Sequence, residues 1–353
     1  MSATDAEMPE AVRAVLEQGV VVPAHPLALT QARKFDRRRQ RALTRYYLDA
    51  GAGGLAVGVH ATQFAIREAG LYDQVLALAA ETARAWTERA IVMIAGIAGR
   101  TNQAVAEASI ARGLGYHAGM VSLAAFKGAS EDQMIEHCAR LAQAIPLIGF
   151  YLQPAVGGVI LPVSFWRRFA AIDNVVAIKI APFNRYRTIE VIQGVIEARA
   201  ENRITLYTGN DDHIVLDLLT PFGAKRDGAV VEARIKGGLL GQWGVWTRTA
   251  VRLLERLHQA VEDQCIDADL LALDWRITDA NRAIFDVAHD FRGCIPGCHE
   301  ILRRQGLLEG IWCLDAQEVL SPGQADDIDR VCRAYPELAD DDFVAANLER
   351  WLD

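Results

Sequence analysis

Short apolar runs alternate with longer amphipathic segments along most of the chain. The apolar runs are rich in Val, Ile, Ala and Gly and are bounded by turn residues, which is typical of buried strands. They fall at residues 19–26, 53–60, 91–99, 117–124, 146–154, 175–182, 203–211 and 227–235. The amphipathic segments predict helices at 35–51, 71–88, 101–115, 130–145, 162–172, 184–200 and 241–263, with a short one within 212–223.

Strands that alternate with helices predict an α/β fold with parallel pairing. Eight such units over about 240 residues match the size of a (β/α)8 TIM barrel. A doubly wound open sheet is the alternative, but no glycine-rich dinucleotide fingerprint follows the first strand. We expect a polar N-terminal leader at 1–18 that contains a short helix, a barrel at 19–263, and a C-terminal helical region at 264–353 packed on the barrel.

The run at 175–182, VVAIKIAP, contains a single lysine, Lys179. A charged lysine inside a buried strand costs several kcal/mol unless it is paired. Burial therefore lowers its pKa and makes the neutral amine available as a nucleophile, which a Schiff-base lysine requires. The alternative is a lysine near a strand end whose amine reaches solvent.

The reactive groups of a TIM barrel lie at the C-terminal ends of its strands. Two of the candidates there have a purely structural alternative. Tyr151 can be a buried ring whose hydroxyl bonds to the backbone, and Asp211 can cap the following helix. The candidates at the predicted strand ends are His25, Gly58, Val59, His60, Gly99, Phe126, Tyr151, Pro154, Lys179, Gly209, Asn210, Asp211 and Glu232.

Four motifs follow one another along the chain: GLAVGVHATQF at 54–64, FYLQPAVGG at 150–158, AIKIAP at 177–182 and LYTGNDD at 206–212. As an ordered set they resemble the dihydrodipicolinate synthase / N-acetylneuraminate lyase family of class I aldolases. That family has a glycine-rich turn after the second strand and a Tyr-x-x-Pro on the fifth. It has a Schiff-base lysine on the sixth strand and a Gly-Asp/Asn turn on the seventh.

The resemblance implies a lyase that uses no cofactor other than its own covalent Schiff base. Lys179 would form an imine with a pyruvate-like 2-oxo acid, for aldol cleavage or condensation or for loss of water. Tyr151 would move protons at the carbinolamine and the substrate. A homo-oligomer, tetramer or dimer, is also implied. The substrate contacts carried over are Gly58, Val59, His60, His25, Phe126, Gly209 and Asn210.

Three positions depart from the family pattern. The two hydroxyl residues that bind the substrate carboxylate are Val59 and His60 here. The tyrosine after the fourth strand is Phe126, and the arginine of the synthase branch is Val156. Loss of that arginine argues against dihydrodipicolinate synthesis, whose substrate is dianionic.

Two histidines can replace the missing hydroxyls. His25 and His60 end adjacent predicted strands, and an imidazole N–H can donate to a carboxylate. Either ring can instead pack inside the protein with its nitrogens bonded to the backbone.

Composition and charge narrow the classes of partner that the sequence predicts. The 353 residues are 51% hydrophobic and 23% charged, with a net charge of −8, which is ordinary for a globular protein. The basic cluster at 33–41, RKFDRRRQR, is interrupted by an aspartate and is weak evidence for nucleic acid. No apolar run reaches the roughly 18 residues that a membrane helix needs. The first residues lack the regions of a signal peptide, so we expect a cytoplasmic protein with reduced cysteines.

Two other functions stay open. A family member without catalysis would only bind a small molecule, which the altered carboxylate turn favours. A metal-dependent barrel hydrolase would use His25, His60 and Glu232, although these form no compact ligand motif. The CIPGC motif at 294–298 lacks the second cysteine pair of a typical zinc site, so we expect no metal.

Overall fold

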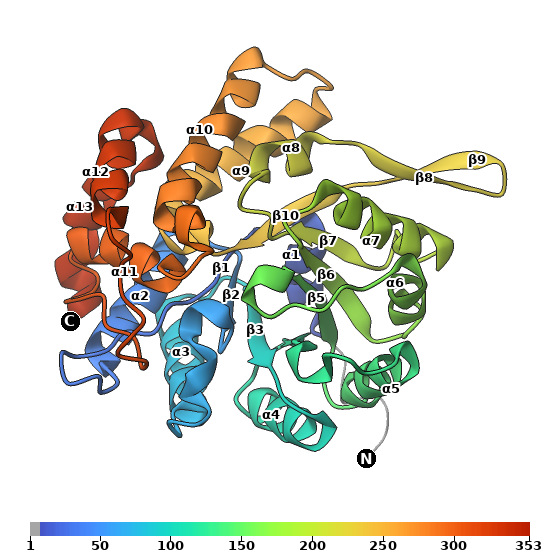
Figure 1. The fold of residues 1–353 in the computed structure, drawn as a ribbon, viewed down its shortest axis with the longest axis horizontal. Coiled ribbons are helices and arrows are strands. Elements are labelled where there is room, and N and C mark those ends of the chain that lie inside the picture. Colours follow the sequence, from blue (N-terminus) through green and yellow to red (C-terminus); the bar gives the residue numbers. More distant parts are fainter. Residues whose placement is uncertain (1–7) are drawn as a thin grey trace.

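The computed structural model describes residues 8–353 and shows a barrel of parallel strands surrounded by helices (Figure 1). The strand order in the sheet is β1-β10-β7-β6-β5-β4-β3-β2. A parallel bridge between Ala24 and Ala56 joins the edge strands β1 and β2, so the barrel is nearly closed. The barrel strands are β1 Val21–Pro23, β2 Gly54–Val57, β3 Val92–Ile97, β4 Ala118–Val121, β5 Leu147–Leu152, β6 Val175–Ala181, β7 Thr205–Thr208 and β10 Ile235–Leu240.

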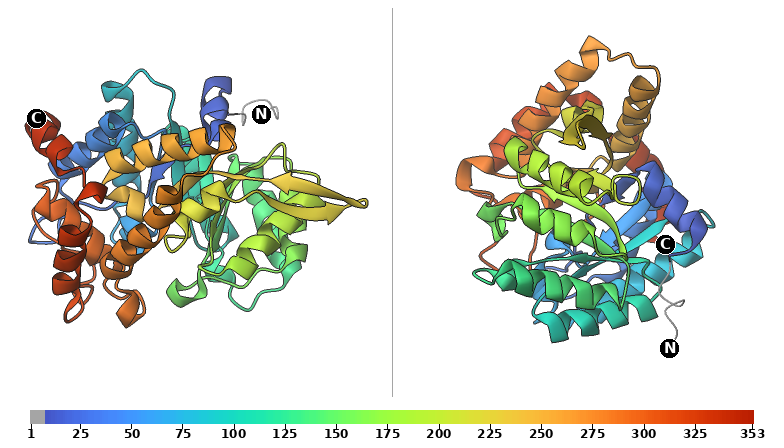
Figure 2. Two further views of the ribbon diagram at one scale, coloured as in Figure 1. Left: turned by 90° about the horizontal axis from the view of Figure 1, so that it is seen from above. Right: turned by 90° about the vertical axis from the view of Figure 1, so that its right-hand side faces the viewer.

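Helices cover the outside of the barrel, as the three views in Figures 1 and 2 show. The predicted TIM barrel with a C-terminal helical extension is therefore confirmed. The helices that follow the strands are α2 Arg37–Ala50, α3 Tyr72–Trp86, α4 Thr101–Gly113, α5 Glu131–Ala142, α6 Val163–Ala170, α7 Arg185–Glu197, α8 Ile214–Leu219 and α9 Thr247–Glu262. The C-terminal helices are α10 Ala268–Ile284, α11 Cys294–Arg304, α12 Gln324–Ala334 and α13 Asp341–Leu352.

Local signals in the sequence set several helix ends. The Asp36 side chain accepts a hydrogen bond from the Arg39 backbone N–H and caps α2. Ser130 and Gln133 form a capping box at the start of α5. Gly51 ends α2 at a φ of 100°, a left-handed conformation in which a glycine carries little strain.

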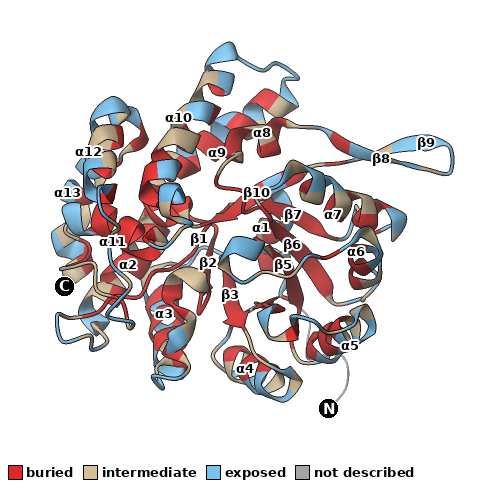
Figure 3. Cartoon of the chain, viewed as in Figure 1, coloured by how far each residue is buried: buried red, intermediate tan, exposed pale blue. Residues whose placement is uncertain are grey.

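The eighth barrel strand lies elsewhere than the sequence predicts. Residues 227–235 were expected there, but β9 (Ala229–Ala233) pairs antiparallel with β8 (Phe222–Arg226) in a hairpin that extends away from the barrel (Figure 1). The next segment, β10, pairs with β1 and β7 instead. The hairpin tip is exposed (Figure 3), and Glu232 is exposed on β9, remote from the strand ends that carry chemistry.

Two glycines explain why β10 escapes prediction. Glycine weakens the strand signal because it has no side chain to pack. A Cβ on Gly237 would lie 2.6 Å from the Tyr207 ring, and one on Gly238 would lie 2.4 Å from the Trp243 ring. Close packing therefore requires glycine at both positions, and the two glycines interrupt the apolar pattern from which a strand is predicted.

The N-terminal helix α1 (Glu10–Gln18) closes one end of the barrel. Val12 and Leu16 belong to the apolar cluster that fills the barrel interior. The Tyr207 hydroxyl donates a hydrogen bond of 2.8 Å to the Leu16 carbonyl. The predicted short helix at 10–18 thus contributes Val12 and Leu16 to the core, and residues 1–7 lie outside the described part of the chain.

The C-terminal helices are anchored to the barrel by buried polar contacts. The Tyr46 hydroxyl donates to the Asp340 carboxylate at 2.8 Å, and the buried Trp351 indole donates to Asp49 at 2.6 Å. In residues 8–353, no helix combines the length and apolar character needed to cross a membrane.

Leu16→Ala should lower the free energy of unfolding by about 2–5 kcal/mol, because it opens a cavity in the packed barrel interior. Urea denaturation measures this loss. Glu17→Ala, at an exposed position of the same helix, is the control and should stay within about 0.5 kcal/mol of wild type. Equal losses from both variants would contradict a closing role for α1.

Candidate active site

A pocket of about 90 Å³ lies at the C-terminal ends of the barrel strands. Side chains from β5, β6 and the turns after β2 and β7 form its inner walls. The C-terminal region forms the opposing wall, so it covers the barrel mouth rather than packing only on the outside. The lining residues include Val59, His60, Met120, Phe150, Leu152, Gln153, Val156, Lys179, Phe183, Gly209, Asp211, Phe285, Phe291, Cys294, Ile295, Cys298 and His299.

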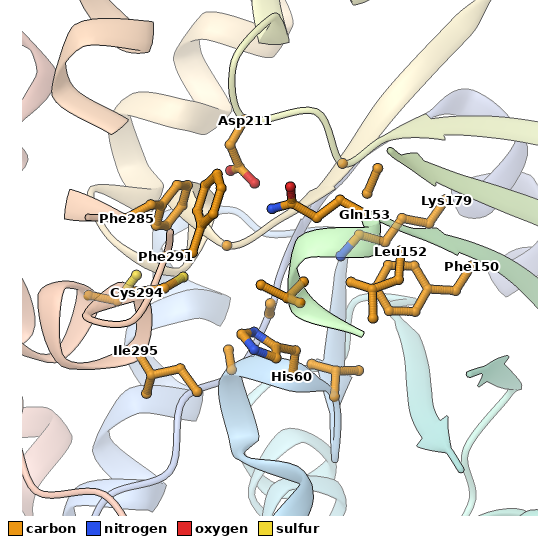
Figure 4. Close-up of a pocket in the computed structure, with 18 of the residues that line it drawn as sticks. His60, Phe150, Leu152, Gln153, Lys179, Asp211, Phe285, Phe291, Cys294 and Ile295 are labelled. Atoms are coloured by element: carbon orange, nitrogen blue, oxygen red, sulfur yellow. The ribbon is translucent and has the colours of Figure 1, made fainter. Parts of the chain in front are cut away.

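Lys179 projects into this pocket from β6 (Figure 4). It pairs in register with Phe150 of β5, and its Nζ lies 4.5 Å from the centre of the Phe150 ring. Among the described residues, none forms a hydrogen bond or an ion pair with the amine. Burial lowers the pKa of Lys179 to about 8, while the negative charge of Asp211 acts in the opposite direction. The alternative of a solvent-exposed lysine does not hold, since the residue is 8% exposed.

Gly209 makes room for the lysine. A Cβ at position 209 would lie 2.6 Å from Lys179 Cε and 2.7 Å from Ala181 Cβ. The Gly209 backbone N–H donates to the Ile180 carbonyl at 2.7 Å, which holds the end of β7 against β6. The predicted site residue Gly209 is therefore next to Lys179, and its absent side chain is the relevant feature.

Asp211 follows on the same turn and faces the pocket (Figure 4). Its Oδ1 accepts a hydrogen bond from the Gln242 backbone N–H at 3.1 Å, and its carbonyl accepts one from Asn281 Nδ2 at 2.7 Å. Burial raises the pKa of Asp211 to about 7, against the lowering effects of the Gln242 N–H and the Lys179 charge. The helix-cap alternative fails, because α8 begins only after His213.

His60 also lines the pocket, beside Val59. Burial and, to a smaller extent, the charge of Lys179 lower the pKa of His60 to about 4, so its imidazole is neutral at pH 7. Gly58 lies outside the pocket wall. It supports the turn instead, with a φ of 76° and its N–H bonded to Thr62 Oγ1 at 2.9 Å.

His25 does not share the pocket with His60. The residue is fully buried, and its Nε2 lies 2.9 Å from Thr44 Oγ1 of α2. Its Nδ1 lies 2.9 Å from the Pro26 carbonyl and 3.0 Å from Gln40 Nε2. The structural alternative therefore applies to His25, and the expectation that two histidines share one anion is corrected. A metal centre of His25, His60 and Glu232 is likewise not assembled.

Tyr151 faces away from Lys179. Successive side chains on a strand point to opposite sides, and Phe150 and Leu152 are the residues of β5 that face the pocket. The Tyr151 ring packs 5.2 Å from Trp166 of α6, and its hydroxyl accepts a bond from the Leu161 N–H at 3.2 Å. This placement corrects the prediction that Tyr151 relays protons beside Lys179.

Phe126 lies in a separate groove next to α5. Its ring contacts Arg100 at 5.0 Å and His137 at 4.3 Å, and it does not line the pocket of Lys179. Phe126 is therefore not at the wall of the pocket, and the substrate contact predicted for it is corrected.

Asn210 has a structural position behind the pocket. Its Oδ1 accepts from the Phe183 N–H at 3.0 Å, and its Nδ2 donates to Asp217 at 2.9 Å. Phe183, held at a φ of 50°, lines the pocket and packs 5.8 Å from the Phe291 ring. Asn210 thus shapes the pocket through Phe183 and has no place on its wall.

Sequence reasoning missed the residues of the C-terminal region that cover the pocket. We call these residues the covering wall: Phe285, Phe291, Cys294, Ile295, Cys298 and His299. Cys294 and Cys298 are four residues apart in α11, so they lie on one helix face, which is turned toward the pocket. Burial raises the pKa of both thiols, which keeps them protonated. Within residues 8–353, no group of three His, Cys, Asp or Glu side chains is arranged to hold a metal ion. The sequence CIPGCH does not by itself indicate a pocket wall. This role becomes clear only from the position of α11 over the barrel mouth.

The dihydrodipicolinate synthetase family model matches residues 18–233. The chain belongs to this family. The matched segment of this dihydrodipicolinate synthetase family member contains Lys179, Gly209 and Asp211 and ends before the covering wall. No curated protein matches the sequence.

Solved structures of the family share the fold at low identity. Dihydrodipicolinate synthase from Aquifex aeolicus has a TM-score of 0.72 at 17% identity, covering 91% of this chain and 99% of that chain. The Acinetobacter baumannii synthase complexed with pyruvate has a TM-score of 0.72 at 18% identity, covering 89% and 98%. N-acetylneuraminate lyase from Fusobacterium nucleatum has a TM-score of 0.70 at 14% identity, covering 90% and 99%.

Gly209→Ala should push the Lys179 side chain out of its position, because the new Cβ would overlap Cε. We expect the pKa of Lys179 to rise from about 8 toward the ordinary value of about 10.4 as the amine moves toward water. The pH dependence of amine methylation at Lys179, followed by mass spectrometry, measures this. Gly113→Ala is the control, because nothing lies within 4 Å of its Cβ position. An unchanged pKa in Gly209→Ala would show that the lysine needs no space at residue 209.

Proposed function

We propose that this protein is a class I lyase in which Lys179 forms a Schiff base with a small 2-oxo acid. The observation that carries the proposal is a lysine amine, buried at the mouth of a barrel, whose pKa is about 8. Compared with a lysine of pKa about 10.4, this shift raises the neutral fraction at pH 7 roughly 200-fold. The neutral amine can attack the ketone carbon and, after loss of water, form an iminium that accepts electrons from a breaking bond.

The size and lining of the pocket favour a small monoanionic substrate. A volume of about 90 Å³ is several times the roughly 10–15 Å³ that a cavity needs to hold one water, which fits a compact 2-oxo acid. Among the described residues that line the pocket, none is an arginine. Val156 lines the pocket at the position where the synthase branch of the family has its arginine. The pyruvate named in the A. baumannii synthase complex is a molecule of this class. Aldol chemistry and dehydration both stay compatible with this site.

The carboxylate of such a substrate would meet His60 and backbone N–H groups of the turn after β2. Because His60 is neutral near pH 7, its contact would be an ordinary hydrogen bond and not a charge-assisted one. The homo-oligomeric state and the cytoplasmic location stay predictions.

A binding protein without turnover is the second candidate. It is favoured by the outward orientation of Tyr151, which removes the proton relay that the family resemblance implied. The two candidates differ in whether an adduct at Lys179 goes on to product.

Borohydride reduction with a panel of 2-oxo acids, pyruvate first, should add the mass of the reduced acid to the peptide that contains Lys179. Lys179→Arg should give no adduct and no turnover while keeping the fold. Intact mass, peptide mapping and a product assay measure the result. An adduct on Lys127, Lys225 or Lys236 in place of Lys179 would contradict the assignment. A Lys179 adduct with no product from any acid would favour binding alone.

His60→Ala should raise the KM for a 2-oxo acid by about two- to tenfold, since a neutral hydrogen bond contributes about 0.5–1.5 kcal/mol. Turnover at saturation should change less, because uniform binding is what is lost. The effect should be constant between pH 6 and 8, because the imidazole loses its proton well below that range. Steady-state kinetics at several pH values test this. His117→Ala, at a histidine outside the pocket, is the control.

A further inference from the structure

Imine formation needs a group that moves protons at the reacting carbon, and the expected group is absent from the pocket. The carbinolamine hydroxyl must take up a proton before it can leave as water. The Tyr151 hydroxyl is bonded to the Leu161 N–H on the outer side of β5. Some other side chain on the pocket wall must therefore exchange the proton if Lys179 acts as proposed above.

We propose that the Asp211 carboxyl is this acid–base group, working as a pair with the Lys179 amine. Both side chains project into the same pocket, from the neighbouring strand ends of β7 and β6 (Figure 4). The proposal rests on the Schiff-base function of Lys179 and names the residue that completes it.

The surroundings of Asp211 hold its carboxyl still without neutralising it. One oxygen is fixed by the Gln242 N–H, and the main chain is fixed by Asn281 from α10. In the part of the chain that the structure describes, no side chain hydrogen-bonds to the carboxyl. The covering wall of Phe285 and Phe291 keeps water away, so the carboxyl can hold or release a proton near neutral pH.

The other ionisable groups on the wall are poorly suited to this role. The pKa values of His60 and His299 are lowered to about 4 by burial, so neither is a proton donor at pH 7. The Cys294 and Cys298 thiols have pKa values raised by burial and stay protonated. Asp211 and Lys179 are left as the two pocket groups that titrate close to neutrality, at about 7 and about 8.

The proton movements balance as follows. The neutral Lys179 amine bonds to the ketone carbon, and the carbonyl π electrons pass to the oxygen. Asp211 relays one proton from the new ammonium nitrogen to that oxygen, which gives the neutral carbinolamine. The protonated Asp211 then donates its proton to the hydroxyl, the C–O bond breaks, and water leaves. The products are an iminium cation on Lys179 and the Asp211 carboxylate, which can accept a proton from the substrate in the next step.

This mechanism predicts a bell-shaped pH dependence of imine formation. Below about pH 7 both groups are protonated and the amine cannot attack, whereas above about pH 8 both are deprotonated and no acid remains. The active form carries one proton on the pair. Removal of the Asp211 charge should also lower the pKa of Lys179, because that charge raises it in the wild type.

The test is Asp211→Asn, which keeps the shape and the acceptor for the Gln242 N–H but cannot transfer protons. Stopped-flow mixing with pyruvate, followed by borohydride quench and mass analysis, measures imine formation between pH 5.5 and 9.5. We expect the rate to fall on the order of a hundred- to ten-thousand-fold. The descending alkaline limb should disappear, and the remaining ascending limb should shift to lower pH.

Two controls separate this role from a structural one. Asp212→Asn removes a carboxyl outside the pocket wall whose charge adds to the raised pKa of Asp211, so it should shift the profile to slightly lower pH but keep the maximal rate within about twofold of wild type. Asp211→Glu keeps a carboxyl and should keep both limbs of the profile, and it decides the question if Asp211→Asn does not fold.

A bell-shaped profile and a near-normal rate in Asp211→Asn would overturn the proposal, even if KM rises. Loss of the alkaline limb in a folded Asp211→Glu would overturn it as well. Absence of any adduct in the wild type would instead refute the Schiff-base function itself.

Discussion

The constraint around which the site is built is that a lysine amine and an aspartate carboxyl share one buried, mostly apolar pocket. Removal of each group from water disfavours its charged form, so the pKa of Lys179 falls and that of Asp211 rises until the two values nearly meet. Their mutual attraction limits both shifts. Near neutral pH the pair therefore holds about one proton in total. Burial disfavours an unbalanced charge on either group.

Several features of the fold serve this pair. The missing side chain at Gly209 lets the lysine cross from β6 to the centre of the mouth. Gln242, on the turn after β10, fixes the carboxyl, and Asn281 of α10 fixes its backbone. The C-terminal helices thus do more than extend the barrel, because they supply the wall that excludes water and part of the support for Asp211. An open barrel mouth would leave Lys179 close to its ordinary pKa, with little neutral amine at pH 7.

The sequence predicts the barrel, the position of Lys179 and the family well, because each depends on patterns that extend over many residues. It fails where one residue of register or one tertiary contact decides. On β5 the alternation of side chains assigns Phe150 to the pocket and Tyr151 to the outside, and the apolar run FYL does not show which side each residue faces. His25 ends its strand as expected, but Thr44 and Gln40 of α2 bind its ring. The covering wall could not be predicted, because nothing in CIPGCH records that α11 lies over the barrel mouth.

Charge balance in the pocket links the protonation of Asp211 to substrate binding. A 2-oxo acid, the proposed substrate, would bring one negative charge into a pocket without arginine, where His60 is neutral. If Asp211 were ionised at the same time, two anions would face one cation at low dielectric, and like charges so placed raise the pKa of one of them. Repulsion by the bound carboxylate therefore raises the pKa of Asp211, and attraction for the ammonium raises the pKa of Lys179 as well, so the pair would keep its proton to a higher pH in the complex. The pH range in which the pair carries one proton would thus lie higher in the complex than in the free protein, and a permanent arginine cation beside the carboxylate would weaken this shift.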